Sequence, residues 1–348
     1  MKKKITKPVT AGKTMLGRRK MIKGLAGLPI FAGSVGSFLK NETIKGEALA
    51  VNKYQQDAAA LKIKLPRGRL GTFEVTRLIM GCNPMSGYAH ARDLLYANTL
   101  FKTYHTDEKV LGTFRIAEEA GINTTFITNP NFPVFRKYRD EYGGKMQTIN
   151  QTYLLRSSDF FEDINKAIDN GANMLYIQGG ESDRLVREGR IKELASAIEY
   201  IKKKGYAAGI GAHSLEVIKA ADRESVPADF YVKTFHHDKY WSAHPESERE
   251  EFSVDYKRYP DHDKIHDNMF DLFSGKTREY MSGVSKPWIA FKVLAAGAIS
   301  PADGFRFAFE NGADFICVGM FDFQIVADVK TAGDVLTGLK NRQRAWFS

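Results

Sequence analysis

Cysteine is nearly absent from this chain: Cys82 and Cys317 are the only two among 348 residues. They lie far apart in the sequence and belong to no group of cysteines at metal-ligand spacing. Their scarcity therefore excludes a disulfide framework and a cysteine-rich metal site. We expect each to be a small buried apolar residue rather than a nucleophile.

Acidic residues are missing from the first forty positions, and this absence explains the net charge of the chain. Residues 1–40 hold ten of the 51 lysines and arginines and none of the 41 aspartates and glutamates, so 41 basic and 41 acidic residues remain. A nucleic-acid or anionic-membrane surface needs a persistent positive patch on the folded domain. The neutral remainder argues against a nucleic-acid partner.

Apolar runs of membrane-spanning length are also lacking. Gly24–Phe38 has only 15 residues and is diluted by glycine, whereas a span needs about 20. This stretch follows Arg18-Arg19 and Met21-Ile22-Lys23, and Ala48-Leu49-Ala50 fits a cleavage site. The order resembles a twin-arginine (Tat) signal peptide. It implies a leader with a polar linker over residues 1–50, the Tat machinery as partner, a periplasmic or other extracytoplasmic destination, and no stable membrane anchor after cleavage.

Residues 51–348 alternate short β-like runs with helical patterns, which indicates a parallel α/β fold. Eight such units over about 265 residues have the size and rhythm of a (β/α)8 TIM barrel. The predicted strands are Arg77–Gly81, Thr124–Thr128, Gln147–Gln151, Met174–Gln178, Ala208–Ala212, Phe230–Phe235, Trp288–Val293 and Phe315–Gly319. The predicted helices are Lys109–Ala120, Asp159–Asn170, Ile191–Lys204, Leu215–Ala221, Pro301–Glu310 and Gln324–Leu336.

One long interruption, residues 238–285, follows the sixth predicted strand and is rich in charge and aromatics. Loops of this length inside compact domains are usually functional. We expect it on the face of the barrel where active sites form.

Four stretches together resemble the aldo-keto reductases. They are LPRGRLGTFEVTRLIMGCNPMSG, EEAGINTTFITNPN, IEYIKKKGYAAGIGAHSLEVIKAA and FRFAFENGADFICVGMFDFQIVADV. The resemblance covers most of residues 66–336 apart from the insertion. It implies a TIM barrel that opens with an N-terminal hairpin.

The family reduces carbonyls with NADPH, using an Asp, a Tyr, a Lys and a His beside the nicotinamide. None of the four is retained here. Their positions fall on Phe126, near Asn131, on Asn150 or Gln151, and on Gln178.

The cofactor end departs from the family as well. Ala212-His213 stands where the family has Ser-Asn, and Phe321-Asp322 stands where it has basic residues, so Asp322 would repel a phosphate. An exported enzyme also has no access to the cytoplasmic nicotinamide pool. Ordinary NADPH reduction is therefore disfavoured, and NAD(P) is the less expected cofactor.

Polar residues at the ends of the predicted strands should converge at the barrel mouth. His213 would neighbour His236 or His237, and Glu181 or Asp238 would supply an oxygen. Two imidazoles and a carboxylate are a ligand set for Zn or a similar divalent metal. Alternatively, each histidine hydrogen-bonds a carbonyl or carboxylate at the rim.

Lys292, in the seventh predicted strand, is a candidate general base, Schiff-base nucleophile or carboxylate partner, and Lys233 raises the same question. For both, an interior salt bridge is the alternative. The predicted catalytic residues are His213, His237, Lys292 and Gln178.

Amide side chains offer a donor and an acceptor each, which suits a hydroxyl-rich ligand. We expect Asn83, Asn129 and Gln151 to bind substrate, and Tyr240 and Trp241 to stack on a sugar face or to pack the insertion onto the barrel.

Three functions stay open. The first is an exported enzyme that acts on a small polar, carbohydrate-derived substrate by acid/base or metal-assisted lyase, isomerase or hydrolase chemistry. The second is an NAD(P)-dependent oxidoreductase with tightly bound cofactor. The third is a catalytically silent ligand-binding barrel.

Overall fold

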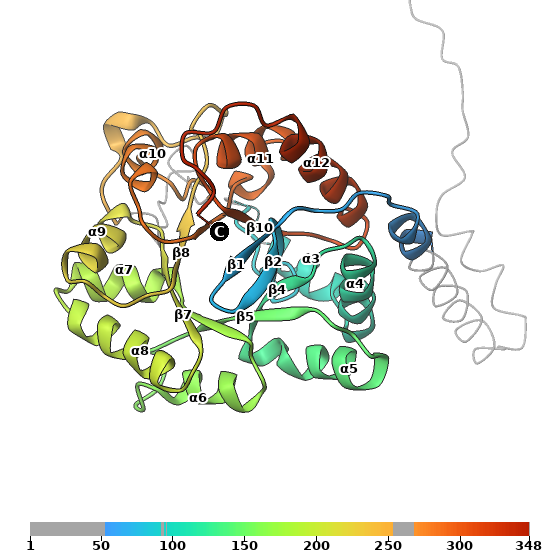
Figure 1. Ribbon diagram of the computed structural model, residues 1–348, viewed down its shortest axis with the longest axis horizontal. Coiled ribbons are helices and arrows are strands. Elements are labelled where there is room, and N and C mark those ends of the chain that lie inside the picture. Colours follow the sequence, from blue (N-terminus) through green and yellow to red (C-terminus); the bar gives the residue numbers. More distant parts are fainter. Residues whose placement is uncertain (1–52, 92–93, 95, 253–267, 348) are drawn as a thin grey trace, which may run out of the picture. The chain divides into compact units, whose positions relative to one another are not determined.

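Eight parallel strands close into a barrel in the computed structural model, which describes residues 53–91, 94, 96–252 and 268–347. Around the barrel the order is β10-β3-β4-β5-β6-β7-β8-β9, so β10 pairs with β3 and closes it (Figure 1). The strands are β3 (Leu78–Gly81), β4 (Thr124–Thr128), β5 (Gln147–Thr152), β6 (Met174–Ile177), β7 (Ala207–Ala212), β8 (Phe230–Thr234), β9 (Trp288–Phe291) and β10 (Phe315–Gly319).

The predicted TIM barrel is therefore confirmed, and each strand end lies within two residues of its predicted position. The predicted Tat leader lies outside the described residues.

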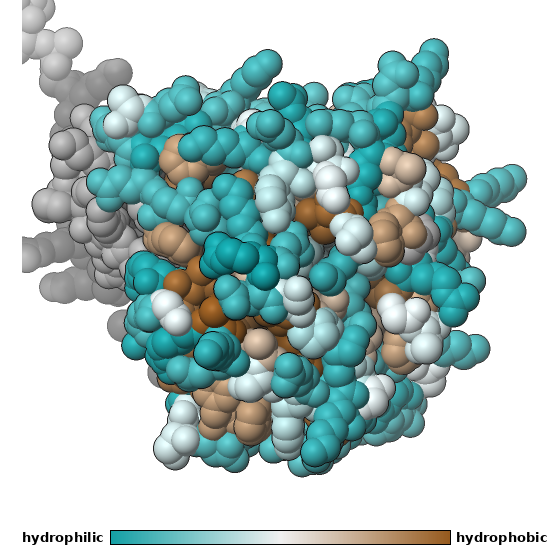
Figure 2. Space-filling model, turned by 60° about the vertical axis from the view of Figure 1, so that its left-hand side comes forward, coloured by the Kyte–Doolittle hydropathy of each residue, from teal (hydrophilic) through white to brown (hydrophobic). Residues whose placement is uncertain are grey.

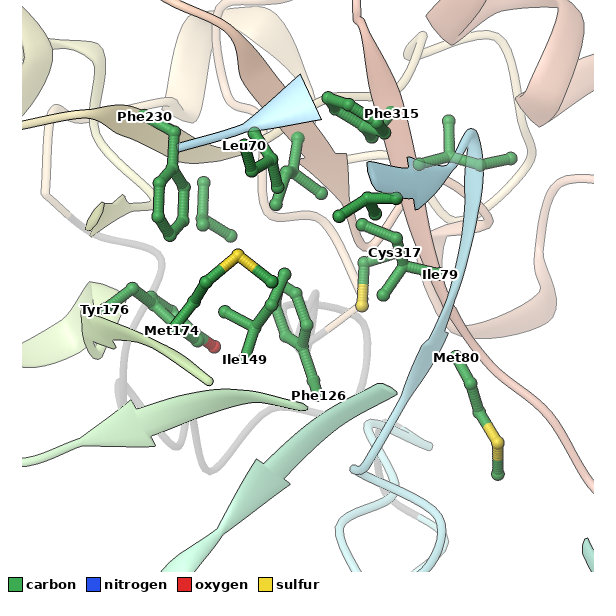
Figure 3. Packing of buried hydrophobic residues seen from close by; sticks show 14 of the residues in the cluster. Leu70, Ile79, Met80, Phe126, Ile149, Met174, Tyr176, Phe230, Phe315 and Cys317 are labelled. Atoms are coloured by element: carbon green, nitrogen blue, oxygen red, sulfur yellow. The ribbon is translucent and has the colours of Figure 1, made fainter. Parts of the chain in front are cut away.

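Apolar side chains from the strands fill the barrel interior. Phe126, Ile149, Met174 and Phe230 come from four different strands and converge beneath Leu70 of the N-terminal hairpin (Figure 3). Strand β6 reads MLYI, and all four of its residues are buried. Burial on both faces is expected where helices cover the outside of a parallel sheet.

Helices form the outer layer (Figure 1). They are α3 (Ala97–Tyr104), α4 (Asp107–Glu119), α5 (Phe132–Tyr142), α6 (Glu162–Asp169), α7 (Gly179–Arg187), α8 (Ile191–Lys203), α9 (Leu215–Arg223), α10 (Ser274–Ser282), α11 (Pro301–Glu310) and α12 (Ile325–Gly338). Six of these correspond to predicted helices, whereas α3, α5, α7 and α10 escape the sequence patterns. Two glycines begin α7, and glycine disfavours helix by about 1 kcal/mol relative to alanine.

The face turned forward in Figure 2 is largely hydrophilic, with hydrophobic residues in small separate patches. Among the described helices, none combines the length and the apolar character needed to cross a bilayer.

An antiparallel hairpin, β1 (Arg67–Leu70) and β2 (Phe73–Thr76), precedes the barrel and confirms the predicted N-terminal hairpin. Its turn contains Gly71 with φ 58°, where a Cβ would lie 2.9 Å from that of Ala207, the first residue of β7. The hairpin therefore covers the N-terminal ends of the barrel strands.

The C-terminal segment secures the same end through Asp314, the residue before β10. The Asp314 carboxylate forms ion pairs with Arg344 at 2.7 Å and with Arg342 at 3.3 Å. Arg77 donates to the Asp314 carbonyl at 2.9 Å. Trp346 stacks between Arg77 and Arg342, whose guanidinium carbons lie 3.9 and 3.6 Å from the ring centre.

The predicted insertion, residues 238–285, forms most of the connection between β8 and β9 and contains the short helix η2 (Glu246–Glu248) and α10. Behind the barrel wall, the Lys233 ammonium lies 2.9 Å from Thr234 Oγ1 and 3.4 Å from the Asp271 carboxylate. Lys233 is fully buried, so the interior salt bridge weighed from the sequence is what the structure contains.

Candidate functional site

A cavity of ≈ 400 Å³ lies at the C-terminal ends of the barrel strands. This volume falls within the range of small-molecule sites. Of the residues predicted to act on substrate, five line it: Asn83, Gln151, Gln178, His213 and Lys292. Phe126, Tyr176 and Cys317, which belong to the packed barrel interior (Figure 3), also line the cavity, and we call this part of the lining its floor.

His213 directly follows β7, and Asp183 of α7 fixes its ring. An Asp183 carboxylate oxygen lies 2.7 Å from His213 Nδ1, and the carboxylate also accepts the backbone N–H groups of His213 and Ser214 at 3.1 and 3.0 Å. Donation from Nδ1–H leaves the lone pair of a neutral ring on Nε2. No described residue hydrogen-bonds Nε2, so it is the basic nitrogen of the cavity wall.

Lys292 enters the cavity because β9 ends two residues earlier than predicted. Its backbone is left-handed, with φ 57°, a conformation that strains a residue other than glycine by about 1 kcal/mol. The ammonium lies 2.7 Å from His90 Nε2 and 3.8 Å from the centre of the Phe270 ring.

Burial, reinforced by the charge of Lys292 and by that of His213 whenever its ring is protonated, lowers the pKa of His90 to about 2. His90 is therefore neutral and accepts a hydrogen bond from the Lys292 ammonium.

A chain of hydrogen bonds runs from the cavity floor to its rim. Tyr176 donates to Gln151 Oε1 at 2.6 Å, and Gln151 Nε2 donates to the Tyr153 hydroxyl at 2.5 Å. Burial raises the pKa of Tyr153 to about 12, so this phenol stays protonated. Above its ring, 3.3 Å from the ring centre, lies the Arg156 guanidinium.

Gln178 lines the cavity but is partly committed, since its Oε1 accepts the backbone N–H of Glu181 at 2.9 Å and caps α7. Cys82 and Cys317 are free and buried, as predicted. Burial raises the pKa of the Cys82 thiol to about 12, so it is not a nucleophile near neutral pH.

Four predicted site residues lie elsewhere. Asn129 donates to the Asp163 carboxylate and backbone carbonyl, both at 2.8 Å, which ties it to α6. The His237 ring faces Phe307 of α11 at 5.5 Å. Tyr240 packs beside His237, and Trp241 is 81% exposed. The insertion instead reaches the cavity through Phe270.

The predicted metal ligands are not assembled into one group. His236 is buried, its Nδ1 facing the His237 carbonyl at 2.9 Å and its Nε2 accepting the Phe270 and Asp271 N–H groups at 3.0 and 3.1 Å. Glu181 accepts two backbone N–H groups after β5, and Asp238 pairs with Arg249 at 2.9 Å. Within the described ranges, no three His, Cys, Asp or Glu side chains cluster to hold a metal.

Asp322 does not line the cavity. Its carboxylate accepts from the Tyr104 hydroxyl at 2.5 Å and from the Lys109 ammonium at 3.2 Å. Because Lys109 pairs with the negative charge of Asp322, this carboxylate would repel a phosphate less than the sequence predicts.

Sequence reasoning missed Asp183, His90, Tyr153 and Arg156. Asp183 belongs to α7, a helix that the sequence patterns did not predict because it begins with two glycines. The other three lie in loops, but each follows a predicted strand closely enough to be assigned to the mouth of a barrel.

The barrel and its cavity can be compared with known proteins. No family model and no curated protein matches the chain. Among solved structures, a Pseudomonas aeruginosa protein assigned to the aldo-keto reductases aligns with TM-score 0.51 and 16% identity over 80% of this chain and 99% of the other.

The monotopic membrane protein (S)-mandelate dehydrogenase aligns with TM-score 0.48 and 8% identity, over 82% of this chain and 83% of the other. At 16% identity, the likeness to the Pseudomonas aeruginosa protein shows a shared fold and nothing about the reaction.

Proposed function

We propose that this TIM barrel, whose cavity at the C-terminal ends of the strands combines apolar side chains with a few polar ones, is an enzyme that moves a proton on a small polar, carbohydrate-derived substrate. Aldose–ketose isomerases that act through an enediolate and dehydratases that act through an enolate both begin with this step. The observation that carries the proposal is the Asp183–His213 pair, whose second ring nitrogen is open to the cavity.

In this reaction His213 Nε2 removes the proton from the carbon next to a substrate carbonyl. Asp183 stabilises the imidazolium that forms. The Lys292 ammonium donates a hydrogen bond to the carbonyl oxygen as it becomes negative, so charge is stabilised where it develops. His90, held neutral by burial, accepts from Lys292 and orients it.

Two outcomes share this enolate. Return of the proton to the neighbouring carbon, with transfer of the hydroxyl proton between the two oxygens, isomerises an aldose and a ketose. Transfer of the proton to a β-hydroxyl expels water and leaves the unsaturated product. In both cases His213 ends as it began, ready for another turnover.

Export by the Tat route remains part of the proposal and is supported by the Arg18-Arg19 pattern. Fractionation of the source cell tests it, with the mature protein expected outside the cytoplasm.

Deuterium exchange tests the proton transfer directly. The purified protein is incubated in D₂O with glucose, fructose, gluconate and glucuronate, and proton NMR follows loss of the signal next to the carbonyl or carboxylate. We expect exchange on at least one compound, and His213→Gln should slow it by on the order of 10²- to 10⁴-fold.

His237→Gln is the matched comparison, because this histidine faces α11 and should leave exchange unchanged. Full exchange by His213→Gln would refute the proposal. Nicotinamide absorbance released on denaturation would favour the oxidoreductase, a stoichiometric divalent metal would favour the metal-assisted version, and saturable binding without exchange would favour the silent barrel.

A further inference from the structure

We infer that the substrate carries an oxyanion, a carboxylate or a phosphate, and that Arg156 binds it. The inference rests on the proposed function and specifies its substrate class. It makes Arg156 a binding residue at the rim, separate from the proton transfer at His213.

The charge of the cavity supports an anionic ligand. The charged side chains of its described lining are the guanidinium of Arg156 and the ammonium of Lys292. Among the lining residues that the structure describes, there is no aspartate or glutamate. A concave site with charges of one sign concentrates ligands of the opposite sign.

Arg156 differs from the other exposed arginines because a ring that is itself held in place by hydrogen bonds lies beneath its guanidinium. Its guanidinium lies over the Tyr153 ring, at 3.3 Å from the centre, and it forms no ion pair with any described acidic residue. Tyr153 is itself held by Gln151, which Tyr176 holds in turn. This series of contacts limits the motion of a side chain that is otherwise flexible, and a preorganised fork loses less entropy on binding.

The hydrogen-bonding capacity of this wall points the same way. The Tyr153 oxygen already accepts from Gln151, and the raised pKa keeps its proton, so its O–H is a donor. Arg156 has donors only. Gln151, by contrast, has both ends of its amide engaged within the chain. A wall rich in donors and poor in acceptors matches the acceptor-only oxygens of a carboxylate or phosphate.

Binding of defined probes tests the inference. Calorimetric titrations compare gluconate and glucose 6-phosphate with the neutral compounds glucose and sorbitol. We expect an acidic probe to bind more tightly than the neutral ones, with an affinity that falls as salt rises. Which acid binds better distinguishes a carboxylate site from a phosphate site.

Three variants test whether Arg156 is responsible for the affinity for acidic probes. Arg156→Gln should weaken acid binding by about 10- to 100-fold, and Arg156→Lys should recover only part of it because the stacked fork is lost. Arg187→Gln, a change at an exposed arginine of α7 outside the cavity, should have no effect. Neutral compounds binding as tightly as the acids, or unchanged affinity in Arg156→Gln, would overturn the inference.

The two proposals fail separately. Should His213→Gln abolish exchange while Arg156→Gln leaves binding intact, the proton transfer stands and the oxyanion site does not. Should acid binding depend on Arg156 while the wild type catalyses no exchange, the binding site stands and the proposed reaction does not.

Discussion

Basic side chains gather at both ends of the barrel, but the two groups differ in whether an acidic residue of the described chain lies among them. At the N-terminal end, the buried Arg344 and the partly buried Arg342 pair with the Asp314 carboxylate, and Arg77 donates a hydrogen bond to the Asp314 carbonyl. At the C-terminal end, the described cavity lining holds Arg156 and Lys292 and contains no acidic residue.

This difference separates stability from function. A buried charge is tolerated only when it is paired and hydrogen-bonded, so the closed end satisfies its arginines within the protein. At the open end, Arg156 forms no ion pair with a described acidic residue, so its charge is left to water and ligand. The contrast agrees with the general division of TIM barrels into a stabilising and a catalytic face.

The largest effect is expected at the closed end. Asp314→Ala removes the carboxylate shared by the buried Arg344 and the partly buried Arg342, and should lower the free energy of unfolding by about 3–5 kcal/mol, measured by urea denaturation. Asp140→Ala, which breaks an exposed pair with Arg139, is the control and should change nothing measurable. Equal stability of the two variants would show that the ion pairs of Asp314 do not stabilise the N-terminal end of the barrel.

At the open end, a substitution should impair the reaction rather than the fold. Asp183→Asn permits an amide N–H to face His213 Nδ1, which favours the tautomer with its proton on Nε2 and removes the base. We expect deuterium exchange to fall on the order of 10²-fold, with a melting temperature close to that of the wild type. Unimpaired exchange would show that the pair is only structural.

Asp328 is another buried carboxylate. Burial raises the pKa of Asp328, in α12, to about 6. Between the unfolded pKa of about 4 and this value, the folded state binds the proton more tightly, so stability contributed by the protonated form is lost as pH rises through that window.

Asp328→Asn should therefore stabilise the protein at pH 7.5, by about 2 kcal/mol, and the gain should shrink toward pH 4. Thermal unfolding at both pH values measures it. A gain that is the same at both would mean that ionisation of Asp328 is not the cause.

Local patterns were enough to predict the barrel, since runs such as FICVG at residues 315–319 and helices such as Ile191–Lys203 carry their own periodicity. The same reasoning failed at α5, although Pro133 in its first turn and Gly143 at its end are ordinary boundary signals. It also failed at the end of β9, because Lys292 adopts a left-handed backbone that nothing in WIAFKVL indicates.

Half of the site was predictable for a similar reason. Residues just after a barrel strand must lie at the mouth, which places His213, Gln178 and Asn83 correctly near the cavity. The rule does not give the direction of a side chain. His236 also follows a strand, yet backbone N–H groups of the insertion bind its Nε2.

By itself, the sequence determined the barrel, the hairpin and the neutral balance of the chain after its basic first forty residues, because these depend on composition and on short-range periodicity. Only the tertiary structure decided which side chains meet. Asp183 reaches His213 across 30 positions, and Lys292 reaches His90 across 202. Such contacts depend on how strands, loops and helices converge at one end of the barrel, and local sequence does not encode that convergence.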